Sequence, residues 1–157
     1  MRIIGIDPGT GILGFGVIEV RRGGITLVDA GVITTPAHTP LEERLEEIFD
    51  SLTGIIHDTQ PQVMSIEKLF FARNVTTAMS VSHARGVVML AGKKAGLRLA
   101  EYTPLQIKQT LTGYGRADKK QMQEMVRLQL KLATSPQPDD AADALAAAIT
   151  HYLMSRS

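Results

Sequence analysis

The chain has 157 residues, of which 44% are hydrophobic and 21% are charged, and it contains no cysteine. This length and composition predict one soluble globular domain spanning 1–157, large enough to bury a core. The lack of cysteine excludes disulfides and thiolate metal sites. No apolar window approaches the ~20 residues of a membrane span, and the first residues lack a signal-peptide pattern. We therefore expect a cytoplasmic protein that does not act in a membrane.

The net charge of +1 hides an uneven distribution along the chain. Residues 1–60 carry four Lys/Arg and nine Asp/Glu, a balance of −5, whereas residues 61–132 carry twelve Lys/Arg and four Asp/Glu, a balance of +8. The last 25 residues carry one Arg and three Asp, a balance of −2. A basic central region suits a polyanion such as a nucleic acid. Charge alone fits an uneven solvated surface equally well.

The first third of the chain predicts three short strands joined by turns. Runs rich in β-branched residues at 3–6, 14–20 and 25–34 are separated by Gly and Pro, which is typical of hairpins. A fourth strand is expected at 63–66, and it would deliver Glu67 at its carboxyl end.

Between the third and fourth strands the apolar period changes to that of a helix. From Leu41 onward, apolar residues recur every three or four positions. We expect Thr39 to be the N-cap of this helix, with Pro40 at its first position and Glu42 completing a capping box.

A long helix is predicted from 74 to 94, and it has apolar or small residues nearly all round. A helix without a polar face is buried on more than one side, and in a domain of this size the second side suits another subunit. A strand at 97–102 and helices at 103–113, from Asp118 and at 139–154 complete the chain. Thr103 with Gln106 is expected to form a capping box at the start of the first of these helices, and Asp118 with Gln121 to start the second. Strands that come early and helices that come late predict an α/β fold with a mixed five-stranded sheet flanked by helices.

Four carboxylates occupy positions that are otherwise apolar. Asp7 ends the first strand and Glu67 the fourth, whereas Asp140 and Asp143 lie on a helix made largely of Ala and Leu. Buried charges require a compensating partner, and several converging carboxylates repel one another unless a cation joins them. Oxygen ligands without His or Cys suit Mg²⁺ or Mn²⁺.

Each acidic residue also has an ordinary structural interpretation. Asp7 before Pro-Gly could be a turn residue, and Asp residues near a helix start interact favourably with the helix dipole. Spacing does not choose between Asp139 and Asp140 as the partner of Asp143. At ~100° per residue they lie ~40° and ~60° from Asp143 around the helix, so either could share a site with it.

Six motifs occur together over essentially the whole chain: Gly5-Ile6-Asp7-Pro8-Gly9, Gly14-Phe15-Gly16-Val17, Ile66 to Asn74, Gln106-Ile107-Lys108-Gln109, Gly115-Arg116-Ala117-Asp118-Lys119, and Asp140 to Ala146 followed by Ala148-Ile149-Thr150-His151. In sequence and order they resemble the RuvC family of crossover (Holliday) junction endodeoxyribonucleases, which have the ribonuclease-H-like fold. The opening motif alone recurs in other ribonuclease-H-like and in actin-like proteins, whereas the full set is specific.

The resemblance implies that Asp7, Glu67, Asp140 and Asp143 are catalytic metal ligands, and thus favours Asp140 over Asp139. Two Mg²⁺ ions per site, for which Mn²⁺ could substitute, would lie ~3.5–4 Å apart with Asp7 bridging them. They would activate a water and stabilise the leaving 3′ oxygen, so that hydrolysis gives a 5′-phosphate and a 3′-hydroxyl.

The resemblance also implies contacts to DNA. Lys108 and Lys119 match positions near the scissile phosphate, where lysine serves as a mobile point charge. Phe70, rather than the phenylalanine that follows it, is expected to stack on bases at the junction centre. Arg73 and Asn74 are expected to contact the DNA backbone.

A four-way junction has two-fold symmetry, so two strands must be nicked symmetrically. We expect a homodimer formed through the helix at 74–94, and the family implies work alongside the RuvA and RuvB branch-migration complex. One alternative is another ribonuclease-H-like nuclease that acts on RNA–DNA hybrids. Two further alternatives are an actin-like nucleotide-binding protein and a non-catalytic DNA-structure binder.

Overall fold

The computed structural model describes residues 1–68 and 75–157. Its strands are β1 (Arg2–Asp7), β2 (Ile12–Arg21), β3 (Gly24–Thr34), β4 (Val63–Glu67) and β5 (Arg98–Tyr102). Its helices are α1 (Leu41–Thr59), α2 (Val75–Lys94), α3 (Pro104–Thr112), α4 (Lys119–Gln129) and α5 (Asp139–Met154). The order of elements is the one that the sequence predicts.

The strands form one five-stranded sheet in the order β3-β2-β1-β4-β5. β1, β2 and β3 are antiparallel neighbours, whereas β4 runs parallel to β1 and β5 parallel to β4. The mixed α/β sheet expected from the sequence is therefore confirmed. The carboxyl ends of β1, β4 and β5 lie at the same edge of the sheet, because parallel strands point the same way.

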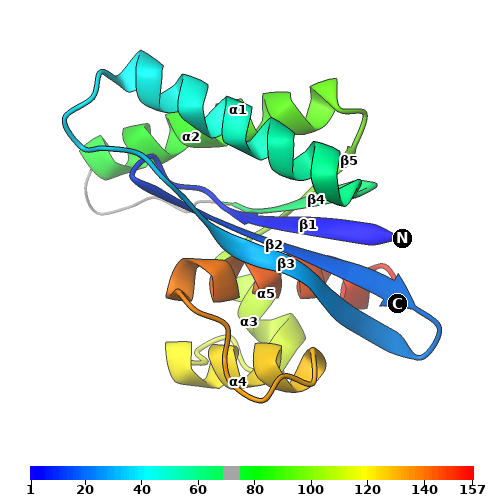
Figure 1. The fold of residues 1–157 in the computed structure, drawn as a ribbon. Coiled ribbons are helices and arrows are strands. Elements are labelled where there is room, and N and C mark those ends of the chain that lie inside the picture. The colour runs from blue at the N-terminus through cyan, green and yellow to red at the C-terminus, as the bar shows by residue number, and fades with distance from the viewer. Residues whose placement is uncertain (69–74) are drawn as a thin grey trace.

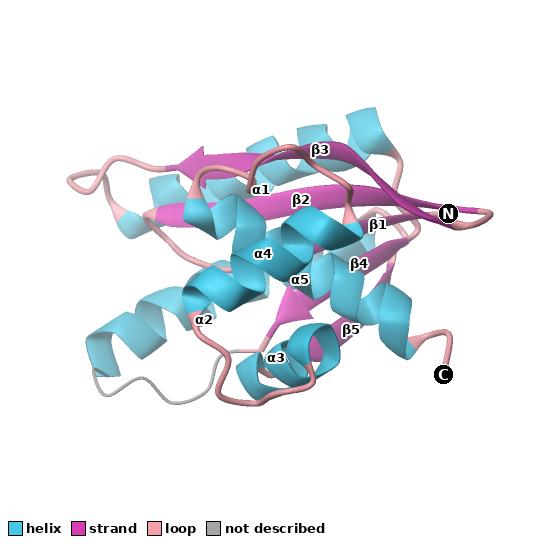
Figure 2. Ribbon diagram, turned by 90° about the horizontal axis from the view of Figure 1, so that it is seen from below, coloured by secondary structure: helices cyan, strands magenta, loops and turns pink. Residues whose placement is uncertain are grey.

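Helices cover both faces of the sheet (Figure 1). α1 and α2 pack on one face, and α5 packs on the other, with α3 and α4 on the far side of α5. Figure 2, viewed from that second side, shows α3, α4 and α5 in front of the strands. α5 is thus enclosed by the sheet and by two helices, which explains why most of its residues are buried.

The two-residue period of β1 divides its side chains between two cores. Ile4 and Ile6 pack in the cluster that includes α1 and α2, whereas Ile3 packs in the cluster that includes α5. Because successive side chains point to opposite faces of a sheet, Gly5 and Asp7 belong with Ile3 on the α5 face. The strand pattern alone therefore directs Asp7 toward α5.

Glycines let the backbone of α5 lie directly against the sheet. A Cβ atom added at Gly5 would lie 1.9 Å from the carbonyl oxygen of Ala144, and one added at Gly14 would lie 2.0 Å from that of Asp140. The buried hydroxyl of Ser65 donates a hydrogen bond of 2.7 Å to the carbonyl of Ala147. These contacts fix the distance between α5 and the sheet.

One predicted helix start is wrong. The N-cap of α1 is Pro40, with an extended backbone and no side-chain cap hydrogen bond, so Thr39 and Glu42 form no capping box. The Thr39 hydroxyl instead donates to the carbonyl of Pro36, 2.6 Å away. That local turn uses the hydroxyl that would have capped the helix.

The two other helix starts that follow predicted caps have complete capping boxes. Thr103 with Gln106 caps α3, and Asp118 with Gln121 caps α4. α3 ends at Gly113, which has a left-handed backbone with φ of 76°. These caps place the first turns of α3 and α4 beside α5.

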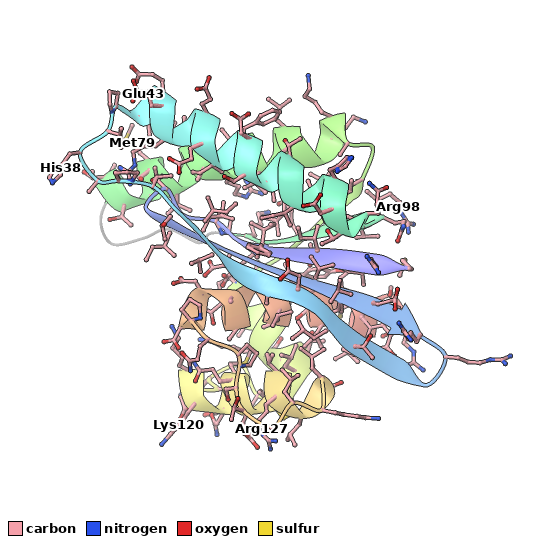
Figure 3. All side chains as sticks on the ribbon, viewed as in Figure 1. His38, Glu43, Met79, Arg98, Lys120 and Arg127 are labelled. Atoms are coloured by element: carbon pink, nitrogen blue, oxygen red, sulfur yellow. The ribbon has the colours of Figure 1, made fainter. Side chains whose placement is uncertain are left out.

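The long helix α2 is buried on one side by the rest of the chain. Its buried residues are Ala84, Val88, Ala91 and Gly92, so none of its first nine residues is buried. Val75, Met79 and Leu90 are more than half exposed, and Figure 3 shows Met79 at the molecular surface. Within a single chain, the helix is therefore buried on one side. None of the helices in the described part of the chain is both long and apolar enough to cross a bilayer.

We expect Gly14→Ala to destabilise the protein by ~1–3 kcal/mol, the usual cost of overpacking. The added methyl group would meet the backbone of α5 rather than a flexible side chain. Urea unfolding measures the effect. Gly54→Ala on α1 is the matched control, because a Cβ there meets no atom within 4 Å, and alanine should stabilise that helix by ~0.5–1 kcal/mol. Equal stabilities for the two variants would contradict the close approach of α5.

Candidate metal centre

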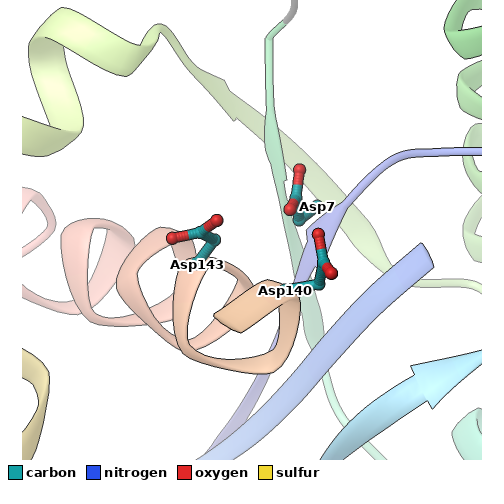
Figure 4. A group of neighbouring side chains, drawn as sticks. All are labelled: Asp7, Asp140 and Asp143. Atoms are coloured by element: carbon teal, nitrogen blue, oxygen red, sulfur yellow. The ribbon is translucent and has the colours of Figure 1, made fainter. Parts of the chain in front are cut away.

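Three aspartates meet where the end of β1 faces the start of α5. Asp7, Asp140 and Asp143 each offer a carboxylate oxygen, and these oxygens lie within 4.8 Å of one another. Figure 4 shows the three carboxyl groups turned toward a common space. Asp140 and Asp143 are three positions apart on α5, so they occupy neighbouring positions on one side of the helix.

Glu67 adjoins this group through the sheet. β4 pairs in parallel with β1, and the register places Ile66 beside Ile6, so Glu67 and Asp7 end neighbouring strands. The two carboxyl groups share a hydrogen bond that favours the protonated form of Asp7 and the ionised form of Glu67. The four predicted ligands are therefore brought to one place.

Burial and mutual repulsion disfavour ionisation of this group. Burial, followed by the charges of Glu67, Asp143 and Asp140, raises the pKa of Asp7 to about 9. Burial also raises the pKa of Glu67 and that of Asp143, although the nearby Lys119 ammonium partly opposes the shift at Asp143. A divalent cation would favour the ionised carboxylates, since it supplies the charge that the protein interior lacks. The donor set therefore fits a hard cation such as Mg²⁺.

The structure separates Asp139 from Asp140, which spacing along the sequence does not. Asp140 lies in the carboxylate group with Asp7. The Asp139 carboxylate instead accepts a hydrogen bond of 2.9 Å from Gln123 of α4 and lies 3.6 Å from the Lys119 ammonium. The ammonium also lies 3.7 Å from Asp143, so it stands between Asp139 and the candidate ligands.

A cleft of about 320 Å³ opens beside the carboxylates. Its walls include Glu67 and Asp143 together with Lys108 from α3 and Lys119 from α4. The first turns of both helices therefore line the cleft, and helix amino termini carry partial positive charge. This combination of two carboxylates and two ammonium groups suits a phosphate that is bridged to the protein by a cation.

The structure places some predicted site residues and leaves others outside its described part. Lys108 and Lys119 are both beside the carboxylates, as stated above. Phe70, Arg73 and Asn74 lie outside the described residues.

Two residues around the site were missed from the sequence. The sequence places Gly14 in a strand and in a family motif but does not indicate that it lies against the backbone of Asp140. Gln123 gives no signal in the sequence, because nothing in local spacing connects α4 to Asp139.

A family comparison bears on these residues directly. Residues 3–151 match the family model for the crossover junction endodeoxyribonuclease RuvC. This chain belongs to the RuvC family. The match contains all four carboxylates, from Asp7 to Asp143, together with both lysines of the cleft.

Relatives and solved structures agree with this assignment. RuvC of Chloroflexus aurantiacus is 54% identical over 151 residues, covering 96% of this chain and 92% of the relative. RuvC of Thermomicrobium roseum is 52% identical over 159 residues, covering 100% and 96%. The structure of Thermus thermophilus RuvC superposes with a TM-score of 0.93 at 36% identity, covering 99% and 96%. A second Thermus structure, in complex with a Holliday junction substrate, gives a TM-score of 0.95 at 37% identity, covering 99% and 95%.

We expect Asp7→Asn to raise the melting temperature of the metal-free protein, more at pH 8 than at pH 5. The folded-state pKa of Asp7 lies above its ordinary value of 3.8, so the folded protein holds this proton more tightly than the unfolded chain. That contribution to stability is lost as pH rises toward about 9, and asparagine removes the loss. A change of ~1 kcal/mol would shift the melting temperature by ~2–8 °C.

Calorimetry in the presence of a chelator measures this shift. Asp50→Asn removes an exposed carboxylate of α1 and controls for the loss of one negative charge. An Asp7→Asn protein that is less stable than the wild type at pH 8 would show that the carboxylate is structural.

Proposed function

We propose that this RuvC-family chain is a Holliday junction resolvase that hydrolyses DNA phosphodiesters at four-way junctions. The observation that carries the proposal is the group of partly buried carboxylates at the end of β1 and the start of α5, in a chain of this family. A 37% identical relative of the same fold is solved with a Holliday junction substrate. Because that relative is bound to a Holliday junction, it does not support an RNA–DNA hybrid as the substrate of this chain.

Asp7, Glu67, Asp140 and Asp143 would hold divalent cations, which we take to be two Mg²⁺ ions. When bound, such ions activate water as a nucleophile and neutralise charge that develops on the phosphate and the leaving oxygen. Asp7 shares a hydrogen bond with Glu67 and offers an oxygen within 4.8 Å of oxygens of Asp140 and Asp143, so it would be the ligand best placed to serve both ions. The rigid strand beneath Asp7 orients its carboxylate before substrate arrives.

The two lysines of the cleft are proposed to hold the scissile phosphate. Lys119 is more than half exposed and makes long contacts of 3.6 and 3.7 Å with two carboxylates, so its ammonium can exchange them for a phosphate oxygen. Lys108 lies in the same cleft on α3. Phe70, Arg73 and Asn74 complete the proposed DNA contacts by resemblance to the family.

Symmetric cleavage suggests a homodimer through α2. Val75, Met79 and Leu90 expose apolar side chains on this helix, and a second copy of the chain would cover them. Sedimentation of the purified protein tests this, since a monomer at all concentrations would exclude it. Association with RuvA and RuvB, and a cytoplasmic location, are proposed from the family alone.

The experiment that tests the function is incubation with a mobile four-way junction and Mg²⁺, with nicks mapped on all four strands. We expect paired nicks on opposing strands, leaving 5′-phosphates that ligase can seal. A chelator should abolish the nicks, because the carboxylates alone supply neither an activated water nor a counter-charge. Faster cleavage of an RNA–DNA hybrid duplex than of the junction would contradict the proposal.

Adjacent aspartates of α5 give a sharp test of the site. Asp140→Asn should slow cleavage by more than the ~10–100-fold that loss of an outer-shell partner costs, because it removes a proposed metal ligand. Asp139→Asn removes the same charge one position away and should slow cleavage only a few-fold. Single-turnover rates at saturating Mg²⁺ measure both, and junction binding without metal should be unchanged. The reverse order of effects would assign the ligand to Asp139.

A further inference from the structure

The loop that follows Asp7 is tied to α2 by a pair of hydroxyl groups. Thr10 is only 4% exposed, and its hydroxyl donates a hydrogen bond of 2.6 Å to the main-chain carbonyl of Ser80. The Ser80 hydroxyl donates in turn to the Thr10 hydroxyl, 2.7 Å away. The two residues are 70 positions apart, so this connection exists only in the folded protein.

The same loop is held from a second direction. The Thr35 hydroxyl donates to the main-chain carbonyl of Thr10 over 2.6 Å, and the Thr35 amide donates to that of Gly11 over 3.0 Å. Arg44 of α1 donates to the Thr35 hydroxyl over 2.9 Å. The loop is thus fixed to α2, to the end of β3 and to α1.

The backbone of Asp7 needs such support on its C-terminal side. The β1 ladder holds its backbone on the other side, through pairing with Gly14. Repulsion from the other carboxylates favours any movement that takes Asp7 away from them. The intervening turn is tight, since a Cβ at Gly9 would lie 2.2 Å from the carbonyl of Ile12, so displacement of Thr10 is passed on to Asp7.

The other end of the connection lies in the half of α2 that the core does not fix. None of residues 75–83 is buried, and the buried residues of α2 begin at Ala84. Apolar packing therefore does not by itself fix the position of Ser80. The hydroxyl pair with Thr10 provides a specific contact between this half of the helix and the domain.

We propose that Thr10 and Ser80 are positioning residues that couple the amino-terminal half of α2 to the carboxylate of Asp7. Without their hydroxyl pair the loop relaxes, Asp7 moves away from Asp140 and Asp143, and metal ions bind less tightly. Any partner or DNA that moves this half of α2 would then change the metal affinity of the site. The effect on cleavage rests on the function proposed above, whereas the effect on metal binding does not.

The test compares metal binding and cleavage among matched variants. Thr10→Val removes both hydrogen bonds at nearly constant volume, Ser80→Ala removes one of them, and Thr10→Ser retains both. Binding of Mn²⁺ to the DNA-free protein is titrated by electron paramagnetic resonance. The Mg²⁺ concentration for half-maximal junction cleavage is measured in parallel, together with melting temperature and metal-free junction binding.

We expect Thr10→Val to weaken Mn²⁺ binding by about 10-fold or more and to raise the half-maximal Mg²⁺ concentration similarly. Ser80→Ala should give a smaller shift and Thr10→Ser almost none. The double variant Thr10→Val with Ser80→Ala should equal Thr10→Val alone, because both act on one contact. Junction binding without metal should match that of the wild type.

Thr59→Val is the control for stability. Thr59 is a buried threonine at the end of α1, and its hydroxyl donates to the carbonyl of Ile55. A folded Thr10→Val protein with wild-type Mn²⁺ affinity would overturn the proposal, as would an equal loss of affinity in Thr59→Val. If the wild type binds Mn²⁺ but nicks no junction, the proposed function fails, and the Mn²⁺ affinities still decide the coupling.

Discussion

The structure depends on the contact between the backbone of α5 and the glycine-lined face of β1 and β2. Four carboxylates that repel one another stay together because β1, β4 and α5, which carry them, are packed against one another. Gly5 and Gly14 let the α5 carbonyls lie where side chains would otherwise stand, so Asp140 and Asp143 remain beside Asp7. The free energy of packing this helix therefore holds the carboxylates together. The raised pKa of Asp7 reflects the burial and the repulsion that this packing opposes.

Strand geometry accounts for the rest of the placement. Glu67 ends β4 as Asp7 ends β1, and the parallel register brings both to one edge of the sheet. Both belong to the α5 face, because Ser65, two residues before Glu67, also bonds to α5. Two elementary rules, alternation of side chains and a shared strand direction, thus determine half of the site before any helix is considered.

Much of this could be predicted from the sequence because it depends on local pattern. The strands, the capped starts of α3 and α4, and the acidic residues at apolar positions all follow from the spacing of apolar residues and from the Gly, Pro and cap residues between elements. The cap at Thr39 failed because a local turn competes for its hydroxyl. The division between Asp139 and Asp140 depends on Gln123 and Lys119, which approach from another helix, so no spacing rule could reveal it.

The position of the acidic pair on α5 explains how so strained a site remains compatible with folding. Asp140 lies in the first turn of the helix, where the dipole favours negative charge by ~0.3–1 kcal/mol, and Asp143 follows one turn later. Most of the remainder of α5 is buried, and the apolar area that it buries opposes the cost of the carboxylates. Because any cation that binds these ligands relieves their repulsion only in the folded state, metal binding must also stabilise the fold. The same interaction that prepares the site for chemistry thereby links its occupancy to the rigidity of the whole domain.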